Sequence, residues 1–128
     1  MAVDSAPDRG SDLLDGDESE LNEALACAFG IRAHDRRTYR ALVRVPDSTV
    51  ADLADELDRD RSNVNRSLST LREAGLATRR RRLLDGGGHV FEYTATPPAA
   101  ARELLHEAFD AWVAGVRDRI DEFGDERA

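Results

Sequence analysis

The residue types that can recognise nucleic acid gather in one segment, Ser48 to Ala77. Asn and Arg side chains can hydrogen-bond adenine and guanine edges, whereas Ser and Arg can bind phosphate oxygens. In a helix, Val64, Leu68 and Leu71 would recur on one face and polar side chains would fall toward the other. We therefore expect an outer face that contacts bases and phosphates, made of Arg61, Ser62, Asn63, Asn65, Arg66 and Ser69.

Two helices joined by a tight turn are expected to position these side chains. Val50 to Leu57 is the expected first helix, capped by Thr49, and Asp60 is the expected N-cap of the second. A carboxylate there favours the positive end of the helix dipole. Gly75 supplies the helix stop, because Gly adopts the left-handed cap conformation without penalty. Helix, turn and helix in this order is the layout that places the second helix in a DNA major groove.

A two-stranded hairpin, or wing, is expected to follow. Residues 76–84 and 89–95 flank the turn sequence Asp-Gly-Gly-Gly, and Leu84, Phe91 and Tyr93 are the expected apolar side. Four consecutive Arg in a strand point alternately to both faces, so we expect them to be solvated or bound to an anion. The expected minor-groove or phosphate contacts of the wing are Arg79, Arg80, Arg81, Arg82 and His89.

Charge is unevenly distributed along the chain. The formal net charge is −8, from 26 acidic and 18 basic residues, and every basic residue is Arg. Residues 1–23 carry eight acidic residues and one Arg, whereas residues 59–82 carry eight Arg against two acidic residues. A basic segment in an otherwise acidic chain points to a polyanionic partner for that segment alone. Abundant Asp without Lys is typical of an extreme halophile, and an acidic protein from a GC-rich genome is the alternative.

Two further helices are expected before the helix-turn-helix, at residues 18–29 and 31–45. We expect Cys27 to be a small buried residue, with a thiol redox sensor as the alternative. The second of these helices is expected to bury Ile31, Thr38, Tyr39, Leu42 and Val43. The arginines on its other faces are either solvated or within reach of a phosphate backbone: Arg36, Arg37, Arg40 and Arg44.

Pro97 and Pro98 open a long final helix, expected from about Ala99 to Phe123. Its apolar residues recur in steps of three and four, over more surface than the wing and the short helices can cover. We expect a partner helix from a second subunit, with core packing within the monomer as the alternative. The expected dimer interface comprises Leu21, Leu25, Leu105, Phe109, Trp112, Val116, Ile120 and Phe123.

The expected divisions of the chain are a disordered acidic tail at 1–17, a DNA-binding domain at 18–98, a dimerisation helix at 99–123 and a tail at 124–128. A single Cys, an acidic N-terminus and the lack of a long apolar stretch favour a cytoplasmic protein without membrane contact. No cofactor, metal site or enzyme activity is expected. The three His have no metal-ligand spacing, and the three Gly at 86–88 lack the continuation of a phosphate loop.

A resemblance to a known family rests on three segments: FGIRAHDRRTYRALVRV (29–45), STVADLADELDRDRSNVNRSLSTLREAGLA (48–77) and RRRRLLDGGGHVFEYTATPP (79–98). They resemble the winged helix-turn-helix regulators of archaea and bacteria, particularly the TrmB-like and MarR-like families. The resemblance implies a recognition helix carrying Arg61 to Arg66, a wing around Gly86 to Gly88 and dimerisation through terminal helices. TrmB-like regulators also carry a large sugar-sensing domain after the winged helix. A single helix follows here, so sugar sensing is not carried over and the small-molecule effector is unknown.

The sequence thus predicts an α+β, mostly α fold: a winged helix-turn-helix with an N-terminal helix and a long C-terminal dimerisation helix. The predicted function is that of a homodimeric, sequence-specific transcriptional regulator of haloarchaeal type on a pseudo-palindromic site in double-stranded DNA. Asn63, Asn65 and Arg66 are expected to contact bases, the serines and wing arginines to contact the backbone, and Arg61 to do either. The alternative is a winged-helix protein-protein interaction module whose arginines dock on an acidic partner.

Overall fold

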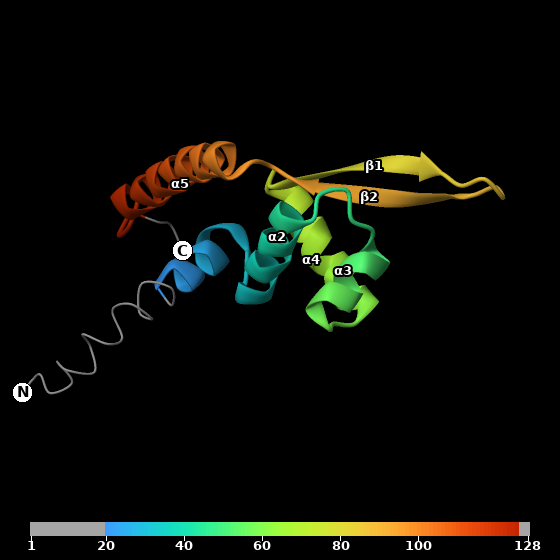
Figure 1. Cartoon of the computed structure of the whole chain (residues 1–128). Helices are drawn as coiled ribbons and strands as arrows, with labels where there is room; N and C mark the ends of the chain where they lie inside the picture. The colour runs from blue at the N-terminus through green and yellow to red at the C-terminus, as the bar shows by residue number, and fades with distance from the viewer. Residues whose placement is uncertain (1–19, 126–128) are drawn as a thin grey trace, which may run out of the picture.

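The computed structural model describes residues 20–125, and the expected tail at 1–17 lies outside them. Residues 20–29 are helical. They are followed by α2 (Ala33–Arg44), α3 (Val50–Leu57), α4 (Arg61–Glu73), the strands β1 (Ala77–Leu83) and β2 (His89–Ala95), and α5 (Pro98–Asp121) (Figure 1). Mostly helical, with one two-stranded antiparallel sheet among the described residues, the chain has the predicted winged helix-turn-helix fold.

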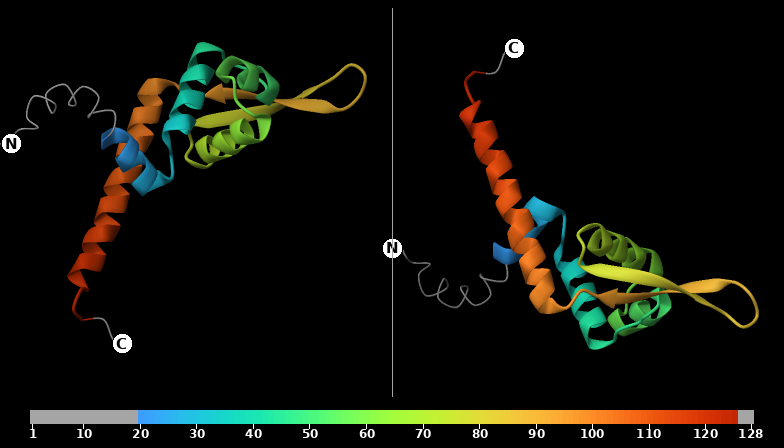
Figure 2. Two further views of the ribbon diagram at one scale, coloured as in Figure 1. Left: turned by 90° about the horizontal axis from the view of Figure 1, so that it is seen from below. Right: turned by 90° about the horizontal axis from the view of Figure 1, so that it is seen from above.

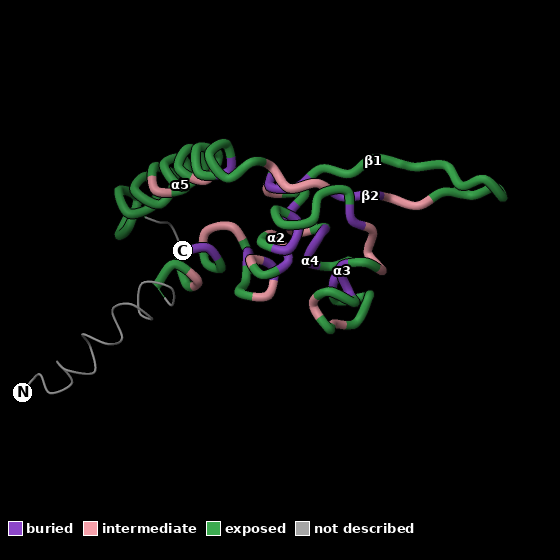
Figure 3. The backbone as a smooth tube through the Cα atoms, viewed as in Figure 1, coloured by how far each residue is buried: buried purple, intermediate pink, exposed green. Residues whose placement is uncertain are grey.

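The core lies where α2, α3 and α4 meet below the sheet. Leu42, Leu53, Val64, Leu68 and Leu71 are at most 1% exposed, and the burial of each such side chain contributes about 1.5–3 kcal/mol. The purple segments of Figure 3 mark this core, which leaves the outer faces of the helices green. Helix α4 therefore rests on a rigid base, and its outward residues have fixed positions relative to the wing.

Local contacts explain why α3 and the turn after it begin and end where they do. The Thr49 hydroxyl accepts a hydrogen bond from the backbone N–H of Asp52 at 3.1 Å, and the Asp52 carboxylate accepts one from the backbone N–H of Thr49 at 3.2 Å. This reciprocal capping box fixes the first turn of α3. Asp58 then adopts a left-handed conformation, φ 53°, which ends α3 and turns the chain toward α4.

The wing is a regular hairpin whose register pairs Ala77 with Ala95 and Leu83 with His89. Gly87 and Gly88 have φ values of 95° and 81°, so the expected turn chemistry is confirmed. Ser48, just before α3, forms an isolated antiparallel bridge with Tyr93. The bridge ties the sheet to the start of the helix-turn-helix.

Helix α5 projects away from this body, on the side opposite the wing (Figures 1 and 2). Ala101 is buried and Leu105 packs against the core, but most of the later large apolar residues remain exposed within the chain. No helix within residues 20–125 is long and apolar enough to cross a membrane.

The structure corrects four expectations about burial. Val43 is 42% exposed, because α2 turns Asp35, Thr38, Ala41 and Leu42 inward and leaves Val43 beside that face. Leu84 is 40% exposed, because it lies in the wing turn beyond the core. Cys27 is exposed, since the helix at 20–29 buries Leu25 instead. Leu25 is only 8% exposed and belongs to the chain's own core, so it offers little surface to a partner.

Candidate nucleic-acid interface

Helix α4 divides into a buried face and an exposed polar face. Val64, Leu68 and Leu71 point into the core, as expected, and Ser67 joins them at 1% exposed. All six predicted contact residues of the helix are exposed: Arg61, Ser62, Asn63, Asn65, Arg66 and Ser69. The helical period brings these polar side chains together because the apolar residues occupy the other side.

Asp60 lies at the expected N-cap position of α4. Its carboxylate accepts a hydrogen bond from the Ser62 hydroxyl. This bond is the main reason that the pKa of Asp60 lies below its ordinary value; the nearby backbone N–H groups of Ser62 and Asn63 and the charge of Arg66 act in the same direction. Ser62 is therefore already hydrogen-bonded in the free protein, beside an ionised carboxylate.

Arg59 has a structural position that the sequence did not indicate. Its guanidinium donates hydrogen bonds to the Thr38 hydroxyl at 3.0 Å, the Ser67 hydroxyl at 3.4 Å and the His34 carbonyl at 3.5 Å. Thr38 and Ser67 are at most 1% exposed, so Arg59 satisfies hydroxyl groups that have little access to water. It links the turn to α2 and α4, and its half-buried guanidinium is already engaged by these three partners.

A shallow polar hollow of about 700 Å³ runs beside α4 toward the start of α2. Arg37 of α2 lines it together with Asn63 and Arg66 of α4, and all three side chains are exposed. Arg32, at the N-cap of α2, completes its positive rim. Of the arginines near α2, Arg32 and Arg37 are thus placed to continue the charged surface of α4.

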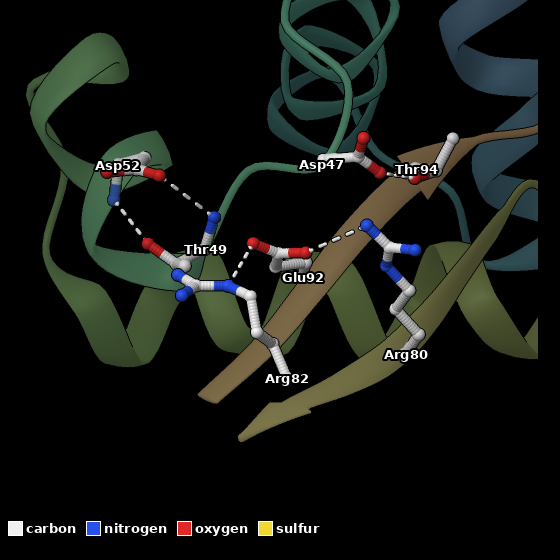
Figure 4. A network of polar contacts seen from close by, with 7 residues as sticks. All are labelled: Asp47, Thr49, Asp52, Arg80, Arg82, Glu92 and Thr94. Atoms are coloured by element: carbon white, nitrogen blue, oxygen red, sulfur yellow. Dashed lines mark hydrogen bonds and ion pairs between the residues drawn. The ribbon is translucent and has the colours of Figure 1, made fainter. Parts of the chain in front are cut away.

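The four wing arginines differ in what they contact. Arg80 and Arg82 lie on one face of β1 and both bind the carboxylate of Glu92 in β2, with 3.3 Å between Arg80 Nη2 and Glu92 Oε1 (Figure 4). Arg79 faces the other way, its guanidinium 3.9 Å from the centre of the Phe91 ring. Among the described residues, the side chain of Arg81 has no such partner. The four arginines of the wing are therefore not equally available to bind an anion.

His89 and the end of the hairpin are exposed. The His89 ring meets the edge of Phe91, with 5.2 Å between the ring centres. Phe91 therefore lies between His89 and Arg79, and it gives this side of the wing an aromatic surface that carries positive charge. No group of three His, Cys, Asp or Glu residues in the part of the chain that the structure describes could hold a metal ion.

A second, apolar hollow of about 520 Å³ lies on the far side of the body, between residues 20–29, α2 and α5. Tyr39 lines it and donates a hydrogen bond to the Thr96 carbonyl at 2.6 Å. Burial raises the pKa of this phenol, and the charge of Arg102 partly opposes the shift. The apolar side chains that remain exposed around and beyond this hollow include Leu21, Phe109, Trp112, Val116, Ile120 and Phe123.

Together, the helix-turn-helix, the wing and the exposed polar face of α4 define the class of winged helix-turn-helix proteins. Residues 25–99 match the family described as "Sugar-specific transcriptional regulator TrmB". The chain belongs to this family of transcriptional regulators, which are not enzymes. The match covers the whole helix-turn-helix and wing and ends at the start of α5.

Several known proteins are similar to this chain in sequence or in fold. An uncharacterized protein of Methanocaldococcus jannaschii is 29% identical over 102 residues, 80% of this chain and 77% of that protein. A possible transcriptional regulator from Methanosarcina mazei superposes with a TM-score of 0.68 at 24% identity, over 81% of this chain and 88% of that one. A MarR protein from Peptoclostridium difficile superposes with a TM-score of 0.54 at 16% identity, over 95% of this chain and 77% of that one. A MepR variant of Staphylococcus aureus bound to an oligodeoxyribonucleotide superposes with a TM-score of 0.52 at 15% identity, over 91% of this chain and 82% of that one.

Proposed function

We propose that this regulator binds double-stranded DNA sequence-specifically, as a homodimer, with α4 of each subunit in the major groove. The observation that carries the proposal is the exposed face of α4, where Arg and Asn side chains project from a helix whose apolar side is fixed in the core. A surface with this composition can hydrogen-bond base edges. The MepR variant, a protein of the same fold, was found bound to an oligodeoxyribonucleotide, which supports DNA as the partner.

In this proposal the exposed residues have separate roles. Asn63, Asn65 and Arg66 contact bases, whereas Ser69, Arg37 and Arg81 contact the phosphate backbone. Arg61 can reach either. Ser62 reaches a phosphate only by leaving the carboxylate of Asp60.

The homodimer is proposed from the exposed apolar residues of α5. Phe109, Trp112 and Val116 lie at steps of three and four, so they share one face of the helix, and each is about 40% exposed. A second copy of α5 would cover them and would set two α4 helices on one side of the dimer. Half-sites about 10 base pairs apart then form a pseudo-palindrome.

The proposal is tested with the variant Arg66→Ala and a fluorescently labelled duplex selected from a genomic library. A bidentate contact with a guanine should make the variant bind its preferred site about 1–3 kcal/mol more weakly, with little change on random DNA. Arg117→Ala, an exposed Arg in α5, is the matched control and should leave both affinities unchanged. An equal loss on both duplexes would show that Arg66 contacts only the backbone, and the absence of any preferred site would contradict the proposal.

A further inference from the structure

The middle of the wing contains an acidic residue, Glu92, on a surface that otherwise favours DNA. The side chain of Glu92 in β2 is 11% exposed, whereas those of Arg80 and Arg82 are 70% and 51% exposed. Arg80 is directly opposite Glu92 in the hairpin register, and Arg82 is two positions further along the same face. Both guanidiniums therefore reach the same carboxylate from neighbouring positions (Figure 4).

This ion pairing is difficult to give up. Glu92 has little contact with water, so an ionised carboxylate left without its arginines would be poorly solvated. A DNA phosphate that approaches the wing must therefore compete with Glu92 for each guanidinium. Arg81 points to the other face of the strand, has no such competitor and can bind a phosphate directly.

We propose that Glu92 limits the sequence-independent part of DNA binding by holding Arg80 and Arg82 away from the phosphate backbone. The inference rests on the proposed function. Phosphate contacts add affinity for every DNA sequence and make binding salt-dependent, because each neutralised phosphate releases counterions. With two of its cations engaged internally, the wing binds DNA less tightly and with a shallower salt dependence than a run of four arginines implies.

The test measures binding of the full chain to a random-sequence duplex by fluorescence anisotropy over a range of potassium chloride concentrations. Glu92→Gln preserves the shape of the side chain but removes its charge. Freeing two arginines should steepen the plot of log affinity against log salt by up to about 1.8, or about 0.9 for each phosphate. The variant should also bind the duplex more tightly than the wild type at low salt. A tenfold rise in salt should then lower the affinity of the variant by up to ~60-fold more than that of the wild type.

Asp85→Asn is the matched control, because it removes one negative charge from the same hairpin. Asp85 lies in the exposed turn and, among the described residues, its side chain has no arginine partner. This variant should bind slightly more tightly while its salt slope remains that of the wild type. Adding Arg80→Ala and Arg82→Ala to Glu92→Gln should return the steepened slope to the wild-type value.

A further variant keeps the inference testable if Glu92→Gln fails to fold. Arg80→Gln with Arg82→Gln in the wild-type background keeps hydrogen-bond donors beside the Glu92 carboxylate and should leave the salt slope nearly unchanged, because neither arginine binds phosphate there. The inference would be overturned if the salt slope of this variant fell by about 1.8, the value for two lost phosphate contacts, or if Glu92→Gln and Asp85→Asn had equal slopes. Either result would leave the proposed DNA binding intact. A wild-type chain that binds no duplex at all would overturn the proposed function and this inference with it.

Discussion

Arg59 and Arg61 lie two residues apart at the end of the turn, yet their surroundings differ. Arg59 donates to the buried hydroxyl groups of Thr38 and Ser67, whereas Arg61 is exposed at the start of α4. Arg59→Ala leaves the Ser67 hydroxyl without its partner and should lower the free energy of unfolding by about 1–3 kcal/mol. Arg61→Ala should change it by no more than about 0.5 kcal/mol. Urea denaturation of the two variants measures both values.

The two substitutions should have the opposite relative effects on DNA affinity. Arg61→Ala should weaken binding, because its exposed guanidinium is available to a base or a phosphate. Arg59→Ala should change the affinity of the folded fraction less, since the half-buried Arg59 guanidinium already donates to the His34 carbonyl and the Thr38 hydroxyl. Equal destabilisation by both substitutions would contradict the internal role of Arg59.

Such differences between arginines explain where the sequence alone was insufficient. Helical period placed Arg66 on the exposed side of α4 correctly, because the apolar residues of that helix fix its orientation. It could not show that Arg59 reaches Thr38 across the turn. Strand alternation indicated that Arg80 and Arg82 share a face, but their pairing with Glu92 depends on the exact register of the hairpin, which alternation does not fix.

At the scale of the elements, the first turn of α4 carries a pH-dependent contact. The pKa of Asp60 lies below its ordinary value of 3.8, chiefly through the Ser62 hydroxyl. Ionised Asp60 therefore stabilises the fold above that value, and this contribution is lost as the pH falls through the lower folded-state pKa. We expect the difference in melting temperature between wild type and Asp60→Asn to shrink as the pH falls below about 3.8.

Ser62→Ala supplies the control for this prediction, because it removes the main cause of the shift. In that background, Asp60→Asn should have a smaller effect at neutral pH and a weaker pH dependence. Thermal unfolding followed by circular dichroism gives the melting temperatures of the wild type, the two single variants and the double variant. A difference between wild type and Asp60→Asn that stays constant across the acid range would contradict the assigned contact.

The elements themselves were largely predictable because their boundaries are encoded locally. Thr49 with Asp52 starts α3, and the glycines of the turn set the hairpin. Burial was harder to predict, because it depends on which faces meet. Cys27 and Val43 belong to amphipathic segments, but the rotation of each helix buries the neighbouring Leu25 and Leu42 and leaves Cys27 and Val43 exposed.

At the scale of the whole molecule, α5 is the element whose apolar surface the chain does not cover. Trp112→Glu places a charge on the exposed apolar face and should convert the proposed dimer into a monomer. Ala114→Glu adds the same charge on the opposite side of the helix and should leave the dimer intact. Sedimentation velocity measures the mass of each. A monomeric wild type, or equal behaviour of the two variants, would contradict a dimer formed through this face.

The central claim is that the exposed face of α4 enters the major groove. Guanine N7 lies in that groove, so protection of guanines from dimethyl sulfate reports contact there directly. On a selected site, the wild type should protect guanines in two clusters about 10 base pairs apart, and Arg66→Ala should lose protection at one guanine in each. Bound protein that leaves every guanine N7 as reactive as in free DNA would contradict the account.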